Sequence, residues 1–410
     1  MDLQAEQLPV IIIGAGIVGL TLAQSLKKDG VPFVIYERDA SSGASEGGWG
    51  ITVHWGLSAF ESCLPPSLFH RLLDIQVDPE QGRKDTGKFL FLDLATAEPR
   101  FSIPASKRLR INRRKLRNLL TTGMNVHWNK TVKSFDTSTP GQVSATFEDG
   151  TIALGSVIVG ADGSSSRTRR LLLGLEKAKL SQLPLRFAGV TMRMTPEEVK
   201  PLRDIDPLLF QGSHADTHTF LWYSTLSTPE VNGSSGAGEY FEGQLNMSWP
   251  VKSEADEVPQ THRDRVTKMK AMAEPFEARL KAAVESIPDD SQVLEIKLQD
   301  WPTQAWDNYQ GRVTLVGDAA HAMTMYRGEA FNHGITDAAR LSEQLIEAHQ
   351  ARTGYERAVE SYESEMRPRT RTAVLLSRQA CLDAHDLNAL TPDSPLVSKR
   401  AIILEPATIE

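Results

Sequence analysis

The chain has 410 residues, enough for two domains or for one large domain with an inserted sheet. Its composition is that of a soluble globular protein, with 40% hydrophobic and 24% charged residues. The formal net charge of -7 argues against a nucleic-acid binder or a binder of anionic membranes. The two cysteines, Cys63 and Cys381, cannot form a disulfide framework. We therefore expect a reduced, cytoplasmic protein without a structural metal.

No segment of the sequence predicts membrane insertion. The apolar stretch 9–22 follows acidic residues, where a secretory signal would be positively charged. No later apolar run approaches the ~20 residues that a bilayer-spanning helix needs.

The first forty residues read as strand, turn, helix and strand. The apolar runs Val10–Ile13 and Phe33–Tyr36 predict strands buried on both faces. The segment 17–28 between them predicts a helix that ends before Gly30. The loop 41–50 that follows is too rich in glycine and serine for regular structure.

The rest of the chain changes character twice. A helix is predicted over 113–122, before short alternating strands and the buried run GSVIVG. Residues 181–300 contain alternating segments that predict an antiparallel sheet, with one helix over 263–286. The buried-strand pattern returns in RVTLVG, and two long helices are predicted over 335–349 and 355–384.

These patterns predict an α/β fold with a Rossmann-type nucleotide-binding domain, an inserted, mainly antiparallel β-sheet domain and long C-terminal helices. The nucleotide-binding domain is expected to be discontinuous, with residues 1–75, 105–180 and 300–385. The inserted sheet domain is expected to take residues 76–104 and 181–299, and residues 386–410 to form a C-terminal tail.

The sequence GAGIVG follows the first strand and opens the first helix. Gly14 permits the tight turn, Gly16 lets a pyrophosphate approach the backbone, and Gly19 lets helix and strand pack closely. The helix N-terminus adds free N–H groups and a partial positive charge. Glu37 ends the second strand, placed to bind a ribose hydroxyl, which favours FAD or NAD over NADP. Arg38 could bind a 2′-phosphate, although an exposed strand-end arginine is the commoner explanation.

Two further motifs place an acid at the end of a buried strand. VGADGSSSRTR brings Asp162 to a turn, and Ser164 is the expected N-cap of the following helix. RVTLVGD brings Asp318 to a strand end, where a carboxylate could bind a sugar-alcohol hydroxyl. The loop MTMYRG then leads into a helix from about Phe331, whose N-terminal N–H groups favour negative charge on a bound ring.

The three motifs, in this order and spacing, resemble those of the class A FAD-dependent monooxygenases, which share a para-hydroxybenzoate-hydroxylase-like fold. The closest similarity is to their fungal secondary-metabolite branch. It covers most of the chain except 181–300, where the family places its substrate-binding sheet. The resemblance implies FAD as cofactor, NADPH or NADH as transient reductant and O2 as co-substrate. In the mechanism that it implies, a C4a-hydroperoxyflavin delivers one oxygen atom to the substrate.

The resemblance also implies roles for individual residues. The glycines of GAGIVG would hold the FAD pyrophosphate, Glu37 the adenosine ribose and Asp318 the ribityl chain. Asp162 would take part in both FAD and NADPH binding. The residues that the resemblance places on FAD are Gly14, Gly16, Gly19, Glu37, Arg113, Asp162, Asp318, Gly328, Ala330 and Asn332, the last three around the isoalloxazine ring.

Aromatic side chains of the glycine-rich loop and the inserted sheet are candidates for substrate binding. These candidates are Trp49, His54, Trp222, Tyr223 and Trp249. Each is more often a core or surface residue, but together they suggest a roomy pocket for an apolar aromatic, polyketide, terpenoid or indole compound. Trp49 is the preferred single candidate, and Trp49, His54 and Met325 are the candidates for a catalytic role. The pair His214 and His218 lies in strand-like sequence, so we expect no metal site there.

Two positions depart from the family pattern. Met325 stands where the family has proline, and it adds a backbone donor and an oxidisable thioether. Ala330 stands where the family has glycine, and a left-handed backbone there would cost on the order of 1 kcal/mol.

Three functions therefore stay open. The first is an FAD- and NAD(P)H-dependent monooxygenase, acting as a monomer or homodimer, that hydroxylates or epoxidises its substrate. The second is a non-redox cyclase or isomerase on the same scaffold, with FAD structural, weakly bound or absent. The third is a flavin-binding protein without catalysis.

Overall fold

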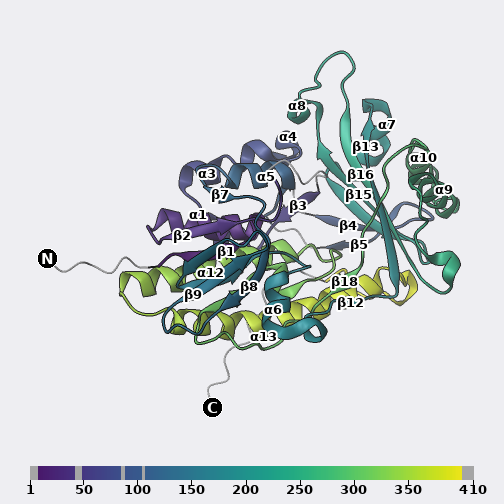
Figure 1. Ribbon diagram of the computed structural model, residues 1–410. Helices are drawn as coiled ribbons and strands as arrows, with labels where there is room; N and C mark the ends of the chain where they lie inside the picture. Colours follow the sequence, from purple (N-terminus) through teal and green to yellow (C-terminus); the bar gives the residue numbers. More distant parts are fainter. Residues whose placement is uncertain (1–7, 42–48, 85–87, 104–106, 399–410) are drawn as a thin grey trace.

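A computed structural model describes residues 8–41, 49–84, 88–103 and 107–398. Its main features are a five-stranded sheet and a seven-stranded sheet that lie side by side (Figure 1). The predicted α/β architecture, with a Rossmann-type sheet and a mainly antiparallel one, is confirmed. None of the helices within the described ranges is long and apolar enough to cross a membrane.

The five-stranded sheet is parallel throughout, with strand order β19-β11-β1-β2-β7. Its strands are β1 (Val10–Ile13), β2 (Phe33–Tyr36), β7 (Val126–His127), β11 (Val157–Gly160) and β19 (Val313–Leu315). The carboxyl ends of parallel strands meet at one edge of the sheet. This edge therefore brings together the GAGIVG turn after β1, Glu37 after β2, Asp162 after β11 and Asp318 after β19.

The strands of this sheet are continuously apolar because both faces of the sheet are covered by other layers of the protein. Val10 and Ile12 belong to the core under the helices, whereas Ile11 and Ile13 pack toward a three-stranded antiparallel sheet. That smaller sheet consists of β8 (Val132–Asp136), β9 (Val143–Phe147) and β10 (Ile152–Gly155). The helices of the other layer are α1 (Ile17–Lys28), α2 (Leu57–Cys63), α5 (Arg113–Leu120), α12 (Ala330–Gln350) and α13 (Glu356–Asp383).

The seven-stranded sheet has the order β17-β13-β16-β15-β14-β4-β5 and is antiparallel except for the pair β14–β4. Its strands are β4 (Phe89–Asp93), β5 (Glu98–Ile103), β13 (Leu185–Met194), β14 (Leu209–Ser213), β15 (Phe220–Ser227), β16 (Phe241–Pro250) and β17 (Leu294–Glu295). One face packs against α7 (Pro196–Arg203), α9 (His262–Met272) and α10 (Ala278–Glu285). The prediction of a single helix over 263–286 is wrong, because Pro275 lies in the break between α9 and α10.

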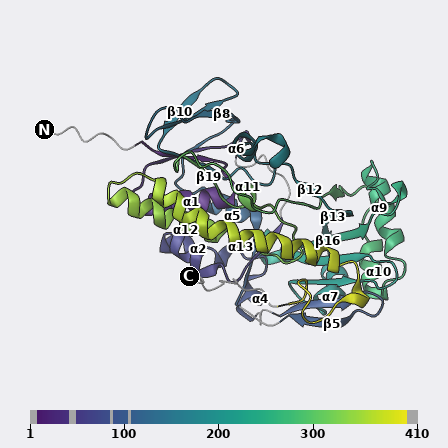
Figure 2. The same cartoon turned by 90° about the horizontal axis from the view of Figure 1, so that it is seen from below.

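Two features join the sheets. A ribbon of β3 (Gly50–Val53) and β6 (Leu109–Asn112) contacts β15, and α13 runs from the parallel sheet to the seven-stranded sheet (Figure 2). Residues 386–398 then pack through leucines against the seven-stranded sheet, so this part of the expected tail is held to the core. Residues 399–410 and most of the 41–50 loop lie outside the described residues.

The remaining elements are short connections. They are α3 (Pro66–His70), α4 (Pro79–Lys84), α6 (Arg167–Lys177), α8 (Pro229–Asn232), α11 (Asp318–His321), the strands β12 (Ser181–Gln182) and β18 (Gln299–Asp300), and the 3-10 turns Leu73–Ile75, Glu254–Asp256 and Leu387–Ala389.

Candidate active site

A cleft lies at the carboxyl edge of the parallel sheet. Among the residues that line it are Gly14, Gly16, Glu37, Arg38, Asp39, Arg113, Arg117, Lys130, Asp162 and Gly163. Six of the residues predicted to bind a cofactor therefore share one cleft, although they come from segments far apart in the sequence. Arg38 is exposed at the cleft, as expected of an arginine at a strand end.

The three glycines of GAGIVG have different surroundings. Gly14 has φ +115°, and a Cβ there would lie 2.4 Å from the Ala161 carbonyl oxygen. A Cβ at Gly19 would lie 2.2 Å from the Gly14 carbonyl oxygen, so this glycine lets the helix pack on the turn. Gly16 has an ordinary φ of -73°, and the nearest atom to a Cβ there would be 4.0 Å away. The protein itself leaves room for a side chain at Gly16, so glycine there suits an occupant of the cleft.

Glu37 and Arg117 belong to one buried network beside this turn. The Glu37 Oε2 accepts a hydrogen bond from the Ala15 N–H at 2.6 Å, and Oε1 accepts one from the Asp39 N–H at 3.0 Å. Arg117 Nε donates to the Ala15 carbonyl at 2.9 Å, and its Nη2 donates to Asp39 Oδ2 at 3.1 Å. Motif reasoning missed Arg117. Its spacing of four residues from Arg113, which puts both on one helix face, is the signal that could have found it.

Arg113 has a different environment. Its guanidinium makes no hydrogen bond or ion pair with any residue that the structure describes, yet it lines the cleft. Burial and the neighbouring Arg117 lower the pKa of Arg113, while the charges of Asp318 and Asp39 oppose that change. A half-buried guanidinium that faces a cleft without a partner is complementary to a phosphate group.

Asp162 accepts hydrogen bonds from the first turn of the helix that follows it. Its Oδ2 accepts a hydrogen bond from the Arg167 N–H at 2.7 Å, and its Oδ1 accepts one from the Ser166 hydroxyl at 2.5 Å. The N-cap of α6 is Ser166, so the prediction of Ser164 is wrong by two residues. Gly163, with φ +78°, continues the turn and delays the start of the helix.

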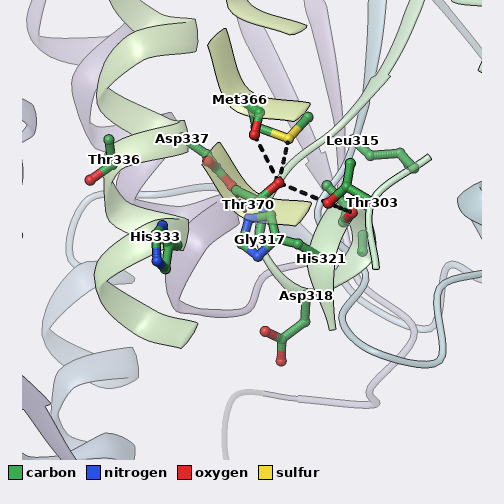
Figure 3. Close-up of polar contacts among 12 residues, drawn as sticks. Thr303, Leu315, Gly317, Asp318, His321, His333, Thr336, Asp337, Met366 and Thr370 are labelled. Atoms are coloured by element: carbon green, nitrogen blue, oxygen red, sulfur yellow. Dashed lines mark hydrogen bonds and ion pairs between the residues drawn. The ribbon is translucent and has the colours of Figure 1, made fainter. Parts of the chain in front are cut away.

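Asp318 begins α11 directly after β19, and its side chain points away from the buried polar cluster behind it (Figure 3). No described residue donates a hydrogen bond to its carboxylate. Burial raises the pKa of Asp318, while His321, Arg113 and Arg169 act in the opposite direction. The carboxylate is therefore left for a ligand group that can donate a hydrogen bond.

Arg169 joins the second and third motifs. This buried side chain donates from Nη2 to the Ser164 carbonyl at 2.5 Å and from Nη1 to the Asp318 carbonyl at 3.2 Å. Its guanidinium also lies 4.9 Å from the ring centre of Trp301. Arg169 ends the VGADGSSSRTR motif, but the sequence does not predict its contact with Asp318, because that contact depends on the pairing of β11 with β19.

Asp337 fixes the backbone of the third motif. Its Oδ2 accepts hydrogen bonds from the Gly317 N–H at 2.8 Å and from His321 Nε2 at 2.5 Å, and its Oδ1 accepts one from Arg369 Nη2 at 2.9 Å. Burial alone would raise the pKa of Asp337, but these three partners outweigh burial and hold the pKa well below its usual range. The Gly317–Asp318 turn therefore rests on a fully buried ionised carboxylate.

A second cavity lies between the β3–β6 ribbon, the seven-stranded sheet and the loop that leads into α12. Among the residues that line it are the predicted Gly328 and Ala330 and the candidates His54, Trp222 and Met325. Much of the remaining lining is apolar, including Ile51, Phe89, Ile103, Leu209 and Phe331. Two of the residues expected around a flavin ring, two candidates for substrate contact and the catalytic candidate Met325 thus meet in one place.

The other three aromatic candidates do not line this cavity. Side chains alternate along β15, so Trp222 faces the cavity while Tyr223 packs on the opposite face, against the helices. Trp249 lies in that same helix-facing core. Trp49 is half-buried, and its carbonyl accepts the Arg113 N–H at 2.9 Å.

Asn332 fixes the loops around the cavity. Its Oδ1 accepts hydrogen bonds from the N–H groups of His54 at 3.0 Å and Gly56 at 3.2 Å. Its Nδ2 donates to the carbonyls of Thr52 at 3.1 Å and Gly328 at 3.2 Å. Because its amide is fully used by the protein, Asn332 acts on an occupant of the cavity only by positioning these loops.

The two departures from the family pattern have different consequences. Ala330 is the first residue of α12 and does not have a positive φ, so the strain that a left-handed backbone would bring is absent. Gly328, with φ +64°, provides the left-handed residue of this loop. The Met325 carbonyl accepts the Gly328 N–H at 2.9 Å, which closes the turn at the cavity wall.

We expect Ala330→Gly to leave FAD affinity unchanged within about twofold, since no strain is relieved. The variant should unfold more easily by roughly 0.5–1 kcal/mol, because glycine is a poorer helix former than alanine. Urea unfolding and FAD titration of the apoprotein measure both quantities. A clear gain in FAD affinity would show instead that the Ala330 methyl obstructs the cofactor.

A buried hydrogen-bond chain stands behind the cavity wall. The Tyr326 hydroxyl lies 2.7 Å from Ser248 Oγ, which lies 2.8 Å from His385 Nε2. His385 Nδ1 lies 2.8 Å from the Cys381 carbonyl oxygen, which makes Nδ1 the donor and Nε2 the acceptor in the neutral ring. Burial lowers the pKa of His385 to about 4.

This shift predicts acid sensitivity. The unfolded chain takes up a proton at His385 near pH 6.5 and the folded protein only near pH 4, so the stabilisation is complete above pH 6.5 and is lost as pH falls. The loss should reach roughly 3 kcal/mol near pH 4. Urea unfolding between pH 7 and 4 should show a shallower pH dependence for His385→Gln than for the wild type. Equal slopes for the two proteins would contradict the assignment.

Two family models match the chain. Residues 114–377 match a model described as an FAD binding domain, and residues 12–74 match a model described as an NAD(P)-binding Rossmann-like domain. Together they cover most of the parallel sheet, most of the residues that line the cleft, and the loop of the third motif.

Named relatives are similar to the chain over most of their length. The chain is 55% identical over 352 residues to the FAD-dependent monooxygenase dbaB of Emericella nidulans, covering 85% of this chain and 89% of that protein. It is 32% identical over 390 residues to the FAD-dependent monooxygenase cctM of Talaromyces islandicus, covering 94% and 95%. The solved structure of 2,6-dihydroxypyridine-3-hydroxylase from Arthrobacter nicotinovorans shares the fold, with a TM-score of 0.76 at 19% identity over 98% of this chain and 100% of that one.

Proposed function

The chain belongs to the FAD-dependent monooxygenases, and from this we propose that it uses NADPH or NADH and O2 to hydroxylate or epoxidise a small molecule held in the cavity. One oxygen atom of O2 would enter the substrate and the other would leave as water. The observation that carries the proposal is Gly16, a glycine that the protein's own packing does not require, in a cleft with the guanidinium of Arg113, which no described residue pairs with.

The residues of the cleft fit FAD. Gly16 at the start of α1 and the guanidinium of Arg113 would hold the pyrophosphate, because N–H groups and positive charge converge there. Glu37 would hold the adenosine ribose, and Asp318 would accept a hydrogen bond from the ribityl chain. Arg117 would act as a positioning residue through Asp39 and the GAGIVG turn. When bound, FAD supplies the electron transfer and the oxygen chemistry of the reaction.

The protein's own contribution at the cavity is to bind, orient and exclude water. Gly328 and Ala330 would lie along the flavin ring, and the apolar lining would hold an aromatic, polyketide, terpenoid or indole framework beside it. His54 and Trp222 line the same cavity and are the substrate contacts that we propose. Asn332 would keep both loops at the correct spacing.

Replacing Arg113 with methionine is the direct test of the cofactor site. We expect FAD affinity to fall about 10- to 100-fold, because a charge-assisted contact to phosphate is lost while no hydrogen bond from the guanidinium to a described residue is lost. Arg114→Met, on the exposed side of the same helix, is the matched control and should bind FAD like the wild type. FAD titration of the apoprotein measures both, and equal affinities would place the phosphates elsewhere.

The wild-type protein distinguishes the three candidate functions. A monooxygenase should purify with flavin absorbance and oxidise NADPH or NADH faster when substrate is added. Substrate conversion by a colourless protein without reductant or O2 would support the cyclase or isomerase, the function suggested by Met325. Flavin absorbance without any turnover would support a flavin-binding protein.

A further inference from the structure

Met325 places a thioether on the wall of the cavity that is proposed to hold the substrate. Its side chain is partly buried and lines the cavity together with Gly328 and Ala330, the residues proposed to lie along the flavin ring. It also packs against the core that contains Tyr326. The turn closed by the Gly328 N–H keeps the Met325 backbone at this wall. An oxidisable sulfur therefore borders the space in which O2 and substrate would meet.

No other described methionine is among the residues that line this cavity. The buried methionines are Met192, Met194, Met247, Met269 and Met366. Those that are partly buried, like Met325, but lie outside the cavity lining are Met124, Met272 and Met323. Met323 stands in the same loop as Met325, so it provides a comparison within one segment of the chain.

The sulfur of Met325 has no hydrogen-bond donor among the described residues. By contrast, the sulfur of Met366 accepts the Thr370 hydroxyl at 3.4 Å in the buried polar cluster (Figure 3). A thioether is a weak hydrogen-bond acceptor, and its lone pairs are also the electrons that react with an oxidant. Both lone pairs of the Met325 sulfur are therefore available to an oxidant in the cavity.

The two cysteine thiols do not compete for such an oxidant. Cys63 and Cys381 are buried, and neither is among the residues that line the cavity. Burial raises the pKa of Cys63 to about 11 and also raises the pKa of Cys381, so both thiols stay protonated at neutral pH. A protonated thiol is a poor nucleophile. Among the described residues, Met325 thus provides the sulfur that faces the cavity.

The proposed function supplies an oxidant whenever reductant is consumed without oxygen transfer to a substrate. NADPH, a proton and O2 then give NADP+ and hydrogen peroxide, which carries the two electrons of the reductant. This peroxide would arise beside Gly328 and Ala330, on the wall to which Met325 belongs. The inference below therefore rests on the proposed function.

We propose that Met325 is a self-oxidation site, at which hydrogen peroxide formed in the cavity without substrate converts the thioether to the sulfoxide. A sulfur lone pair attacks one peroxide oxygen, the S–O bond forms and the O–O bond breaks. The departing hydroxide takes the proton of the attacked oxygen and leaves as water, so the sulfur is oxidised by two electrons and the peroxide is reduced. The sulfoxide puts a polar group on an apolar wall, which weakens the binding of apolar rings until it is reduced again.

Peptide mass spectrometry of the FAD-loaded protein tests the site directly. The protein consumes NADPH without substrate under O2 labelled with heavy oxygen, and catalase removes peroxide that escapes into solution. We expect Met325 to gain labelled oxygen at least about tenfold faster than Met323, Met124 or Met272. Hydrogen peroxide added without NADPH is the reference, and the excess of Met325 over Met323 should be clearly smaller there. An equal excess in both experiments, or labelling of Met325 that catalase prevents, would overturn the proposal.

Calorimetric titration with 2-methylnaphthalene, an apolar aromatic probe, measures the consequence for binding. After NADPH consumption the wild type should bind the probe about tenfold more weakly, and methionine sulfoxide reductases should restore the affinity. Met325→Leu keeps the apolar volume without the sulfur, so its affinity should be the same before and after the treatment. Met323→Leu is the matched control and should lose affinity like the wild type. Unchanged affinity of the oxidised wild type would overturn the proposed effect on binding.

NADPH oxidation, followed in the same samples, separates this inference from the proposed function. A protein that consumes NADPH and releases peroxide, but gains no labelled oxygen at Met325, retains the function and loses the self-oxidation site. An FAD-loaded protein that oxidises neither NADPH nor NADH lacks the proposed function. Its flavin is then reduced with dithionite, excess reagent is removed and labelled O2 is admitted. Labelling of Met325 in that experiment retains the site, and its absence excludes both.

Discussion

Asp337→Asn is expected to destabilise the folded protein by about 3 kcal/mol, because it leaves the buried Arg369 without its fully buried counter-charge. Asp337 is fully buried and accepts hydrogen bonds from Arg369, His321 and the Gly317 N–H. An amide of the same shape can accept some of these hydrogen bonds but carries no charge. Urea unfolding of the apoprotein at neutral pH, where the carboxylate is ionised, measures the loss directly.

The matched control is Glu365→Gln, which removes the other carboxylate that contacts Arg369. Glu365 Oε1 lies 2.6 Å from Arg369 Nε, but its side chain is 33% exposed, so water compensates for much of the loss. We expect a destabilisation of at most about 1 kcal/mol for this variant. Equal losses of unfolding free energy in Asp337→Asn and Glu365→Gln would mean that burial does not make one ion pair more stabilising than the other.

The same substitution has a signature in acid. The folded-state pKa of Asp337 lies below its unfolded value, so its stabilisation is complete above the unfolded pKa of about 3.9 and is lost as pH falls toward the folded value. Asp337→Asn should therefore flatten the acid limb of the stability curve below about pH 4. This acid limb lies below the pH range in which His385 titrates. The contributions of Asp337 and His385 to the pH dependence of stability can therefore be measured separately.

The cofactor cleft could be predicted from the sequence because its signals are local. Gly14, Gly16 and Glu37 follow strands that short apolar runs already indicate, and the parallel order of those strands brings their ends together. Ala330 shows what a comparison of residue identities with the family pattern cannot predict. Its identity departs from the family pattern, but only the backbone conformation shows that no strain results.

Residues that act across the chain could not be predicted in this way. Arg169 joins Ser164 to Asp318 only because β11 pairs with β19. Arg110 stands in a run of basic residues, and the local sequence does not show that no carboxylate among the described residues pairs with it. The aromatic character of Tyr223 makes it a candidate for substrate binding, but its position on β15 turns its side chain away from the cavity. Such facts depend on strand register, which a single sequence does not determine.

Gly16→Val is expected to weaken FAD binding by at least about 100-fold, equivalent to about 2.7 kcal/mol, while the apoprotein keeps its fold. The backbone at Gly16 is extended and the space around a Cβ is open, so the protein accommodates the side chain. Valine is a poorer N-cap than glycine, which should lower apoprotein stability by about 1 kcal/mol. FAD titration and urea unfolding of the apoprotein measure the two effects separately.

Gly14→Ala provides the contrast, because its added methyl would meet the carbonyl of Ala161 rather than a ligand. That variant should lose stability without FAD, whereas Gly16→Val should lose mainly the cofactor. The difference matters for the whole site, because the role proposed for Arg113 assumes that the pyrophosphate lies over the start of α1. If Gly16→Val binds FAD normally, the phosphates lie elsewhere. The roles proposed for Arg113 and Glu37 in binding FAD would then be wrong as well.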